Sequence, residues 1–238
     1  MYSVEKLKEN WQEVIKSVED AAVACGRRPE EIKTIAVSKT FPLEYIERAM
    51  QAGIKVFGEN YAQEFRDKHA LLEQKGKVDP EWHYIGHLQR NKVKYLIPHV
   101  KAIHSVDSLK LAKEIAKQAR KHGITQEVFL QVNTSGEDSK FGCDPREIFK
   151  LCSDVKEISE LNVTGLMTIG SLTGDDRIIR SEFQLLRSIR EEITEKLPDV
   201  DLRNLSMGMS GDFPIAIEEG ATHIRIGTAI FGERDYSK

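Results

Sequence analysis

The feature that most constrains the fold is a repeated alternation of short apolar runs and longer amphipathic segments along the 238 residues of the chain. Each run ends in glycine, serine, asparagine or a charged residue, which is typical of a short buried strand. The expected strands are the eight runs Thr34–Ser38, Lys55–Phe57, Trp82–Ile85, Ala102–His104, Val128–Val132, Val163–Thr168, Leu202–Met207 and His223–Ile226.

Helices are expected before and between these runs, because apolar residues recur there every three or four positions. The first helix begins after Ser3, a good N-cap residue, and ends before Gly26 and Pro29. The segment Asn91–Ile97 is short for a helix between two strands. The other expected helices are Leu43–Ala52, Tyr61–Gln74, Leu109–His122, Arg146–Ser153, Asp176–Lys196 and Phe213–Glu219.

Strands joined by helices pair in parallel and are covered on both faces. Eight such units in a chain of this length predict an α/β fold, a single closed (β/α)8 TIM barrel over residues 1–238. The N-terminal helix would lie outside the barrel or across its floor. An open doubly wound sheet is the alternative, but no glycine-rich turn follows the first strand to support it.

Charge and composition exclude several classes of protein. The 35 basic and 38 acidic residues give a net charge of −3, which favours neither nucleic acid nor an anionic membrane. The basic stretch from Arg90 to Lys101 is interpreted as the solvated face of a short helix. The N-terminus has no apolar signal core, no apolar run reaches the ~18 residues of a membrane span, and three scattered cysteines form no disulfide framework. We therefore expect a soluble cytoplasmic protein.

Lys39 is the first candidate functional residue. It follows the first expected strand, and barrel active sites lie at the carboxyl ends of strands. Burial of an ammonium group lowers its pKa, and a neutral amine can attack an aldehyde to form an imine. A solvated lysine that ends a strand is the alternative interpretation of this position.

The segments after the seventh and eighth strands have the composition of a phosphate site. In TIM barrels these two loops commonly bind phosphate. Ser206 and Ser210 offer hydroxyl groups in the first segment, with glycines that admit an anion to the backbone and a helix N-terminus after them. In the second segment, Gly227 admits an anion to the backbone and Thr228 offers a hydroxyl group. Together the two segments predict a phosphate-binding site.

Arg225 precedes the second of these segments. Side chains alternate along a strand, so Arg225 shares its orientation with Gly227. A charged side chain inside a barrel must find a partner. That partner is either a structural carboxylate such as Glu59, or a ring nitrogen or phosphate of a ligand, and spacing does not decide between them.

Other polar residues are expected at the same rim of the barrel. Each cluster is also explained as strand-end capping or core filling. The spacing of His83 and His87 does not indicate a metal site, because a break between strand and loop separates them and no metal-binding motif is present. The rim residues are Glu59, Asn60 and Tyr61 after the second strand, His83, His87, Gln89 and Asn91 after the third, and Met167 in the sixth.

Six runs of the sequence resemble the pyridoxal phosphate homeostasis proteins, a family similar in fold to the N-terminal barrel of alanine racemases. They occur in the order of that family and cover nearly the whole chain. The runs are Ala36-Val-Ser-Lys39, Phe57-Gly-Glu-Asn60, His83-Tyr-Ile-Gly-His-Leu-Gln89, Gly165-Leu-Met167, Ser206-Met-Gly-Met-Ser-Gly-Asp212 and Arg225-Ile-Gly-Thr228.

The resemblance implies that Lys39 carries pyridoxal 5′-phosphate (PLP) as an internal imine. It also implies a role for each of the other matching positions. Arg225 faces the pyridine nitrogen, Asn60 and Met167 line the ring, and the phosphate is held by Ser206, Ser210, Gly227 and Thr228.

The residues are consistent with a PLP carrier that takes part in PLP homeostasis with little or no catalytic turnover. An arginine beside the pyridine nitrogen disfavours the protonated ring, and so weakens carbanion chemistry. Racemisation also needs a second acid–base group, which alanine racemases take from an additional C-terminal domain across a dimer. The chain ends at Lys238, just past the eighth strand, so we expect no such domain, and a monomer. PLP-dependent apoenzymes are the expected recipients.

Two enzymatic alternatives remain at this stage. The first is a PLP-dependent amino-acid racemase, with Tyr61 or His83 as the base. The second is a barrel aldolase that forms a lysine imine with a phosphorylated substrate. Lysines of that kind lie more often on later strands than Lys39, which is an argument by analogy.

Overall fold

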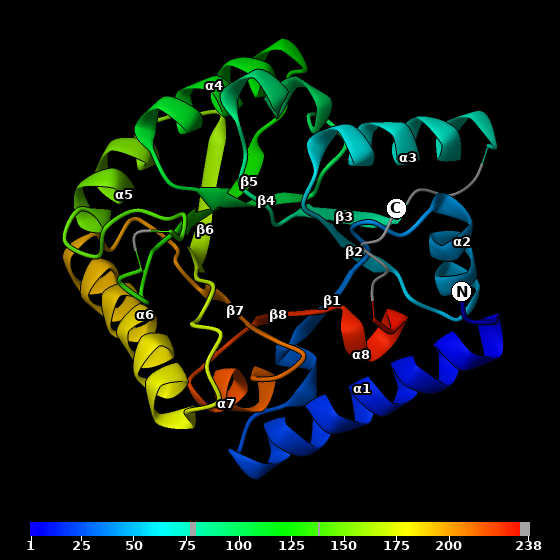
Figure 1. The fold of residues 1–238 in the computed structure, drawn as a ribbon. Helices are drawn as coiled ribbons and strands as arrows, with labels where there is room; N and C mark the ends of the chain where they lie inside the picture. Colours follow the sequence, from blue (N-terminus) through cyan, green and yellow to red (C-terminus); the bar gives the residue numbers. More distant parts are fainter. Residues whose placement is uncertain (77–79, 138, 234–238) are drawn as a thin grey trace.

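The structure is a computed structural model that describes residues 1–76, 80–137 and 139–233. At its centre is a closed barrel of eight parallel strands, in which β8 also pairs with β1 (Figure 1). This confirms the predicted (β/α)8 barrel; the last five residues of the predicted domain lie outside the described residues. The strands are β1 Lys33–Val37, β2 Val56–Glu59, β3 Glu81–Tyr84, β4 Ala102–Val106, β5 Gln126–Gln131, β6 Leu161–Met167, β7 Asn204–Met209 and β8 His223–Ile226.

The helices surround this barrel (Figure 1). Between β3 and β4 the short segment forms a 3-10 helix, η2, over Arg90–Tyr95, and a second one, η1, covers Pro29–Glu31. The α-helices are α1 Val4–Ala24, α2 Leu43–Gln51, α3 Ala62–Gln74, α4 Leu109–Lys121, α5 Ile148–Lys156, α6 Asp176–Lys196, α7 Phe213–Glu218 and α8 Thr228–Phe231.

The N-terminal helix α1 lies outside the barrel, where it contacts α2, α7 and α8 (Figure 1). The Ser3 side chain accepts a hydrogen bond from the backbone N–H of Lys6, as expected for the N-cap. Apolar residues from Leu7 to Ala22 form the buried face. Within that face Asn10 donates from Nδ2 to the carbonyl oxygen of Ile230 at 2.9 Å, which ties α1 to α8.

Three strands end later than the sequence pattern indicates, and one of them is β4, which reaches Val106 where the pattern ends at His104. The pattern ends the seventh strand at Met207, whereas β7 reaches Met209, which is paired with Arg225. The pattern likewise ends the second strand at Phe57, whereas β2 includes Glu59. Pairing with the neighbouring strand extends all three, and such pairing is not visible in local apolar content. Asn60 and Ser210 therefore directly follow strands.

The interior of the barrel holds a small apolar cluster and several polar side chains. The apolar cluster contains Ala102, Phe129 and Met167, and is separate from the larger core between strands and helices. At Gly58 a Cβ atom would lie 2.8 Å from Cγ2 of Ile35, so the interior leaves no room for a side chain there. The buried polar residues of the interior include His83, His104, Ser206, His223 and Arg225.

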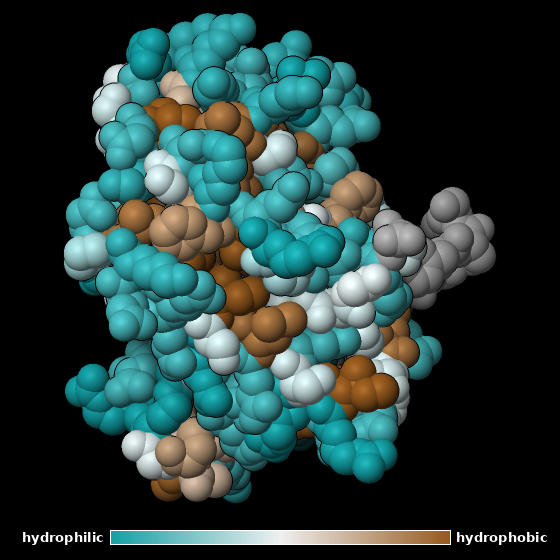
Figure 2. Space-filling view, turned by 90° about the vertical axis from the view of Figure 1, so that its left-hand side faces the viewer, coloured by the Kyte–Doolittle hydropathy of each residue, from teal (hydrophilic) through white to brown (hydrophobic). Residues whose placement is uncertain are grey.

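The outer surface is mainly hydrophilic on the face that carries α5 and α6 (Figure 2). Phe149 of α5 and Ile178 and Leu185 of α6 are among the apolar side chains exposed in the molecule. In the part of the chain that the structure describes, no helix is long and apolar enough to cross a membrane.

Candidate functional site

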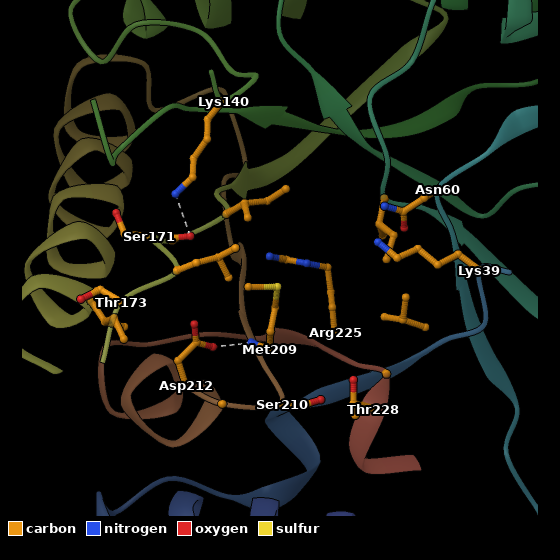
Figure 3. A pocket seen from close by; sticks show the side chains of 18 residues that line it. Lys39, Asn60, Lys140, Ser171, Thr173, Met209, Ser210, Asp212, Arg225 and Thr228 are labelled. Carbon is orange, nitrogen blue, oxygen red and sulfur yellow. Dashed lines mark hydrogen bonds between the residues drawn. The ribbon is translucent and has the colours of Figure 1, made fainter. Parts of the chain in front are cut away.

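A pocket of about 680 Å³ opens at the carboxyl ends of the barrel strands. It lies where TIM barrels place their active sites. Figure 3 shows the residues that line it. Six of the eight residues predicted for cofactor binding belong to this lining, namely Lys39, Asn60, Ser210, Arg225, Gly227 and Thr228.

Lys39 enters the pocket two residues after β1, on the same side as Asn60 (Figure 3). The residue after it, Thr40, has a φ of 68°, which is uncommon outside glycine. Its backbone N–H donates to Oε1 of Glu64 on α3 at 2.5 Å. On the other side of Lys39, the Ser38 hydroxyl donates to Oε1 of Glu59 at 2.6 Å. Both neighbours of Lys39 are therefore held by carboxylates.

A buried lysine, Lys68 of α3, joins these carboxylates. Its Nζ donates to Glu59 Oε1 at 2.7 Å, to Glu64 Oε1 at 2.6 Å and to the carbonyl oxygen of Ser38 at 2.9 Å. Burial raises the pKa of the Glu59 carboxyl, and the Lys68 ammonium opposes that effect. The carboxylate of Glu59 thus pairs with Lys68 and not with Arg225, which was one of the two partners that the sequence left open.

Arg225 reaches the pocket from β8, and its guanidinium points into the pocket (Figure 3). NH1 donates to Oγ of Ser206 at 2.9 Å and NH2 donates to the carbonyl oxygen of Thr168 at 2.8 Å. Burial lowers the pKa of Arg225 to about 10, against the opposing charge of Asp212. The guanidinium is therefore positively charged at neutral pH.

The other two predicted residues, Ser206 and Met167, are fully buried and do not belong to the lining. Ser206 lies beside Arg225, with its Oγ 2.8 Å from Nδ1 of His104. Met167 belongs to the apolar cluster of the barrel interior. Ser206 lies within β7, Asn204–Met209, rather than in the loop after it.

The residues predicted to hold phosphate come together after β7 and β8. Ser210 and Thr228 lie side by side at one edge of the pocket (Figure 3). At Gly211 a Cβ atom would meet nothing within 4 Å, so there is open space against the backbone. Helix α8 starts at Thr228, directly after Gly227, and the first N–H groups of a helix have no acceptor inside it. This edge can therefore donate several hydrogen bonds to an anion.

Sequence reasoning missed Lys140, which lines the opposite side of the pocket (Figure 3). Its Nζ donates to the carbonyl oxygen of Gly170 at 3.0 Å and lies 2.7 Å from Oε1 of Glu137. Lys140 lies in the loop between β5 and α5, whose sequence carries no recognisable motif. Its position shows only in the folded barrel, where this loop approaches the one after β6.

The charge of the pocket favours an anionic ligand. Among the described residues that line it, Lys39, Lys140 and Arg225 are basic and Asp212 is acidic. Burial raises the pKa of the Asp212 carboxyl, and one of its oxygens accepts from the backbone N–H of Met209. Convergent positive charges in a cleft attract anions such as phosphate.

His83 is not at the rim, contrary to the prediction. It lies within β3, and its imidazole is buried in the barrel interior next to His104. His87 stacks on Phe141 with the ring centroids 3.7 Å apart, and Tyr61 is 54% exposed. None of the described lining residues is a histidine or a tyrosine. Residues 1–76, 80–137 and 139–233 contain no group of three metal-ligating side chains that could hold an ion.

Comparison with known proteins relates the chain to PLP-binding barrels. The family model described as "Alanine racemase, N-terminal domain" matches residues 3–235. The pyridoxal phosphate homeostasis protein of Aquifex aeolicus is 43% identical, over 96% of this chain and 98% of that protein. The protein of the same name from Vibrio cholerae is 40% identical, over 98% of each.

Among solved structures, PipY of Synechococcus elongatus with PLP bound has a TM-score of 0.83 and 33% sequence identity. The match covers 95% of this chain and 100% of that chain. Fold, sequence and length therefore agree: the chain belongs to the pyridoxal phosphate homeostasis protein family, whose barrel is that of the alanine racemase N-terminal domain.

Proposed function

We propose that this protein binds PLP through an imine with Lys39 and takes part in PLP homeostasis, with little or no catalytic turnover. The observation that carries the proposal is the convergence of the Lys39 amine, the buried Arg225 guanidinium and a hydroxyl-rich edge on a single pocket of about 680 Å³. A phosphorylated aromatic aldehyde needs these three kinds of group. The family membership of the chain supports the same ligand.

The residues of the pocket fit the parts of PLP. When bound, PLP supplies an aldehyde carbon with which a lysine amine condenses to an imine, with loss of water. Lys39 and Asn60 form one side of the pocket, and Ser210 and Thr228 lie at the adjoining edge (Figure 3). At that edge Ser210, Gly227 and Thr228 would hold the phosphate. Arg225 points into the pocket between them, where its guanidinium would face the pyridine nitrogen (Figure 3). Met167 belongs to the apolar cluster of the barrel interior, against which Ile169 of the pocket lining packs.

Arg225 is the reason to expect little turnover. A charged guanidinium disfavours protonation of the pyridine nitrogen, and the unprotonated ring stabilises a carbanion poorly. Its pKa of about 10 keeps this charge at neutral pH. A carboxylate at this position would have the opposite effect.

A racemase would also need an acid–base group on the opposite face of its substrate. Tyr61 and His83, the residues first considered, do not line the pocket. Lys140 is on the opposite side, where its ammonium is held by Gly170 and Glu137. We therefore favour a monomeric carrier that delivers PLP to apoenzymes over a racemase.

The proposal is tested by adding PLP to the purified protein and recording its visible absorbance. The wild type and Lys140→Ala should both gain the absorbance of an imine, and Lys39→Ala should not. Racemisation of a panel of amino acids by the loaded wild type should stay at background. Absorbance that persists in Lys39→Ala would place the imine elsewhere, and robust turnover that Lys140→Ala abolishes would establish the racemase.

A further inference from the structure

A line of hydrogen bonds runs through the barrel from the pocket to the opposite, amino-terminal end of the strands. Arg225 NH1 lies 2.9 Å from Ser206 Oγ, and Ser206 Oγ lies 2.8 Å from Nδ1 of His104. The line continues from Nε2 of His104 to Nδ1 of His83 at 2.8 Å. It ends with Nε2 of His83, 2.8 Å from Oε1 of Glu81, the first residue of β3. Residues of four strands take part.

When both histidine rings are neutral, the two ends of this line determine the direction of every hydrogen bond in it. A guanidinium can only donate hydrogen bonds and an ionised carboxylate can only accept them. If both histidines are neutral and protonated at Nε2, His83 donates to Glu81 and His104 donates to His83. The Ser206 hydroxyl then donates to Nδ1 of His104 and accepts from Arg225. Each proton in the line has an acceptor in this arrangement.

The reverse assignment satisfies the buried groups less well. With His83 doubly protonated and His104 protonated at Nδ1, Ser206 would accept from both His104 and Arg225. Its own hydroxyl proton would then have no acceptor among the hydrogen bonds of the described side chains. A buried donor left without an acceptor is destabilising, because it loses its hydrogen bonds to water without replacing them.

The electrostatic surroundings also favour neutral imidazoles. His83 and His104 are at most 1% exposed, and burial is the main cause that lowers the pKa of each. The charged and titratable groups that face them come from four strands: Lys33 of β1, Glu81 of β3, Glu127 of β5, and His223 and Arg225 of β8. The hydrogen bond with His83 and the ion pair with Lys33 at 2.7 Å lower the pKa of the Glu81 carboxyl to about 2.

We propose that Ser206, His104 and His83 form a one-directional hydrogen-bond chain that positions the guanidinium of Arg225, with its direction set by Glu81 at the far end of the barrel. NH1 of Arg225 donates to Ser206 Oγ and NH2 donates to the carbonyl oxygen of Thr168. These two hydrogen bonds determine the orientation of the planar guanidinium and of its remaining N–H groups. Ser206, His104 and His83 are positioning residues, because they act through Arg225. The effect on PLP rests on the proposed function, whereas the chain of bonds belongs to the protein itself.

The experiment is ¹⁵N NMR of the histidine side chains in the ligand-free protein, assigned with His83→Gln and His104→Gln. His83 and His104 should each give the signals of a neutral ring protonated at Nε2, unchanged between pH 5.5 and pH 8.5. A positively charged ring in this range, or protonation at Nδ1, would overturn the proposal. Because no PLP is present, this result is independent of whether Lys39 binds it.

Two variants of Glu81 test whether this residue sets the direction. Glu81→Gln keeps an oxygen acceptor for His83, whereas Glu81→Leu removes it. The side chain of Glu81 is 34% exposed, so both variants should fold. Glu81→Gln should retain the Nε2 protonation of both rings, and Glu81→Leu should give mixed protonation at His83 and also at His104. An unchanged His104 in Glu81→Leu would contradict the assigned role of Glu81.

Discussion

The Nζ atom of Lys68 lies 2.9 Å from the carbonyl oxygen of Ser38, the residue that precedes Lys39. The same ammonium contacts Glu59 and Glu64, whose carboxylates bind Ser38 and Thr40. A buried ion pair on α3 and β2 thus determines the course of the chain on both sides of Lys39. This arrangement links the stability of the barrel to the geometry of the proposed PLP site.

Removal of Lys68 should therefore be costly. Lys68→Met leaves the buried Glu59 carboxylate unpaired, and such a change costs about 3–5 kcal/mol of unfolding free energy. The double variant Lys68→Met/Glu59→Gln should recover part of this loss. Urea unfolding of the three proteins measures the effect.

A matched control is Lys75, which follows the same helix. Its Nζ lies 2.9 Å from Oε1 of Glu47, but its side chain is 41% exposed. Exposed ion pairs contribute about 0–1 kcal/mol, so Lys75→Met should leave stability nearly unchanged. Equal losses for Lys68→Met and Lys75→Met would contradict the importance assigned to the buried pair.

Stability should fall as the pH falls below about 6.5. Burial lowers the pKa of His83 and His104, and it lowers that of His223 to about 3, so these rings stay neutral in the folded state. The unfolded chain takes up their protons near pH 6.5, so acid favours unfolding. Each such histidine adds a slope of about 1.4 kcal/mol per pH unit below that value.

The contribution of one ring can be isolated by His223→Gln. Unfolding free energies at pH 7, 6 and 5 should show a slope that is smaller than in the wild type by about 1.4 kcal/mol per pH unit. His122 is exposed at the end of α4, so His122→Gln serves as the control for replacing a histidine outside the barrel interior. A wild-type protein whose stability does not change between pH 7 and pH 5 would show that the buried histidines are charged.

The two hydroxyl groups at the edge of the pocket, those of Ser210 and Thr228, predict a selective loss of affinity for PLP when either is removed. Ser210→Ala and Thr228→Ala each remove one hydroxyl that can donate to a phosphate, worth about 1.5–3 kcal/mol or roughly a 10-fold to 100-fold rise in Kd. Pyridoxal, which lacks the phosphate, should bind the variants and the wild type equally. If affinity for pyridoxal falls as much as affinity for PLP, the hydroxyls do not contact the phosphate.

The barrel could be predicted from the sequence because its signals are local and repeated. Short apolar runs, helical periodicity and the Ser3 cap are each visible within a few residues. The predicted bounds of the eighth strand, His223–Ile226, are those of β8 in the structure. The sequence also predicts those site residues that belong to a motif just after a strand, such as Lys39, Asn60 and Gly227.

What the sequence could not show depends on strand register and on distant loops. Ser206 is paired with His223 of β8 and lies beside Arg225 and His104 in the barrel interior, and this pairing is not visible in the local sequence. His83 is expected at the rim as part of the polar cluster after the third strand, whereas it lies within β3 and its side chain points into the barrel. Lys140 reaches the pocket because its loop, between β5 and α5, lies beside the loop after β6, where its Nζ donates to Gly170.

The central claim is that Lys39 holds PLP, and borohydride trapping tests it most directly. Reduction of the PLP-loaded protein converts an imine to a stable secondary amine, and mass spectrometry of the peptides then locates the pyridoxyl group. The account predicts one labelled residue, Lys39, in the wild type and in Lys140→Ala. A label on Lys140, or a loaded protein that carries no label, would contradict it.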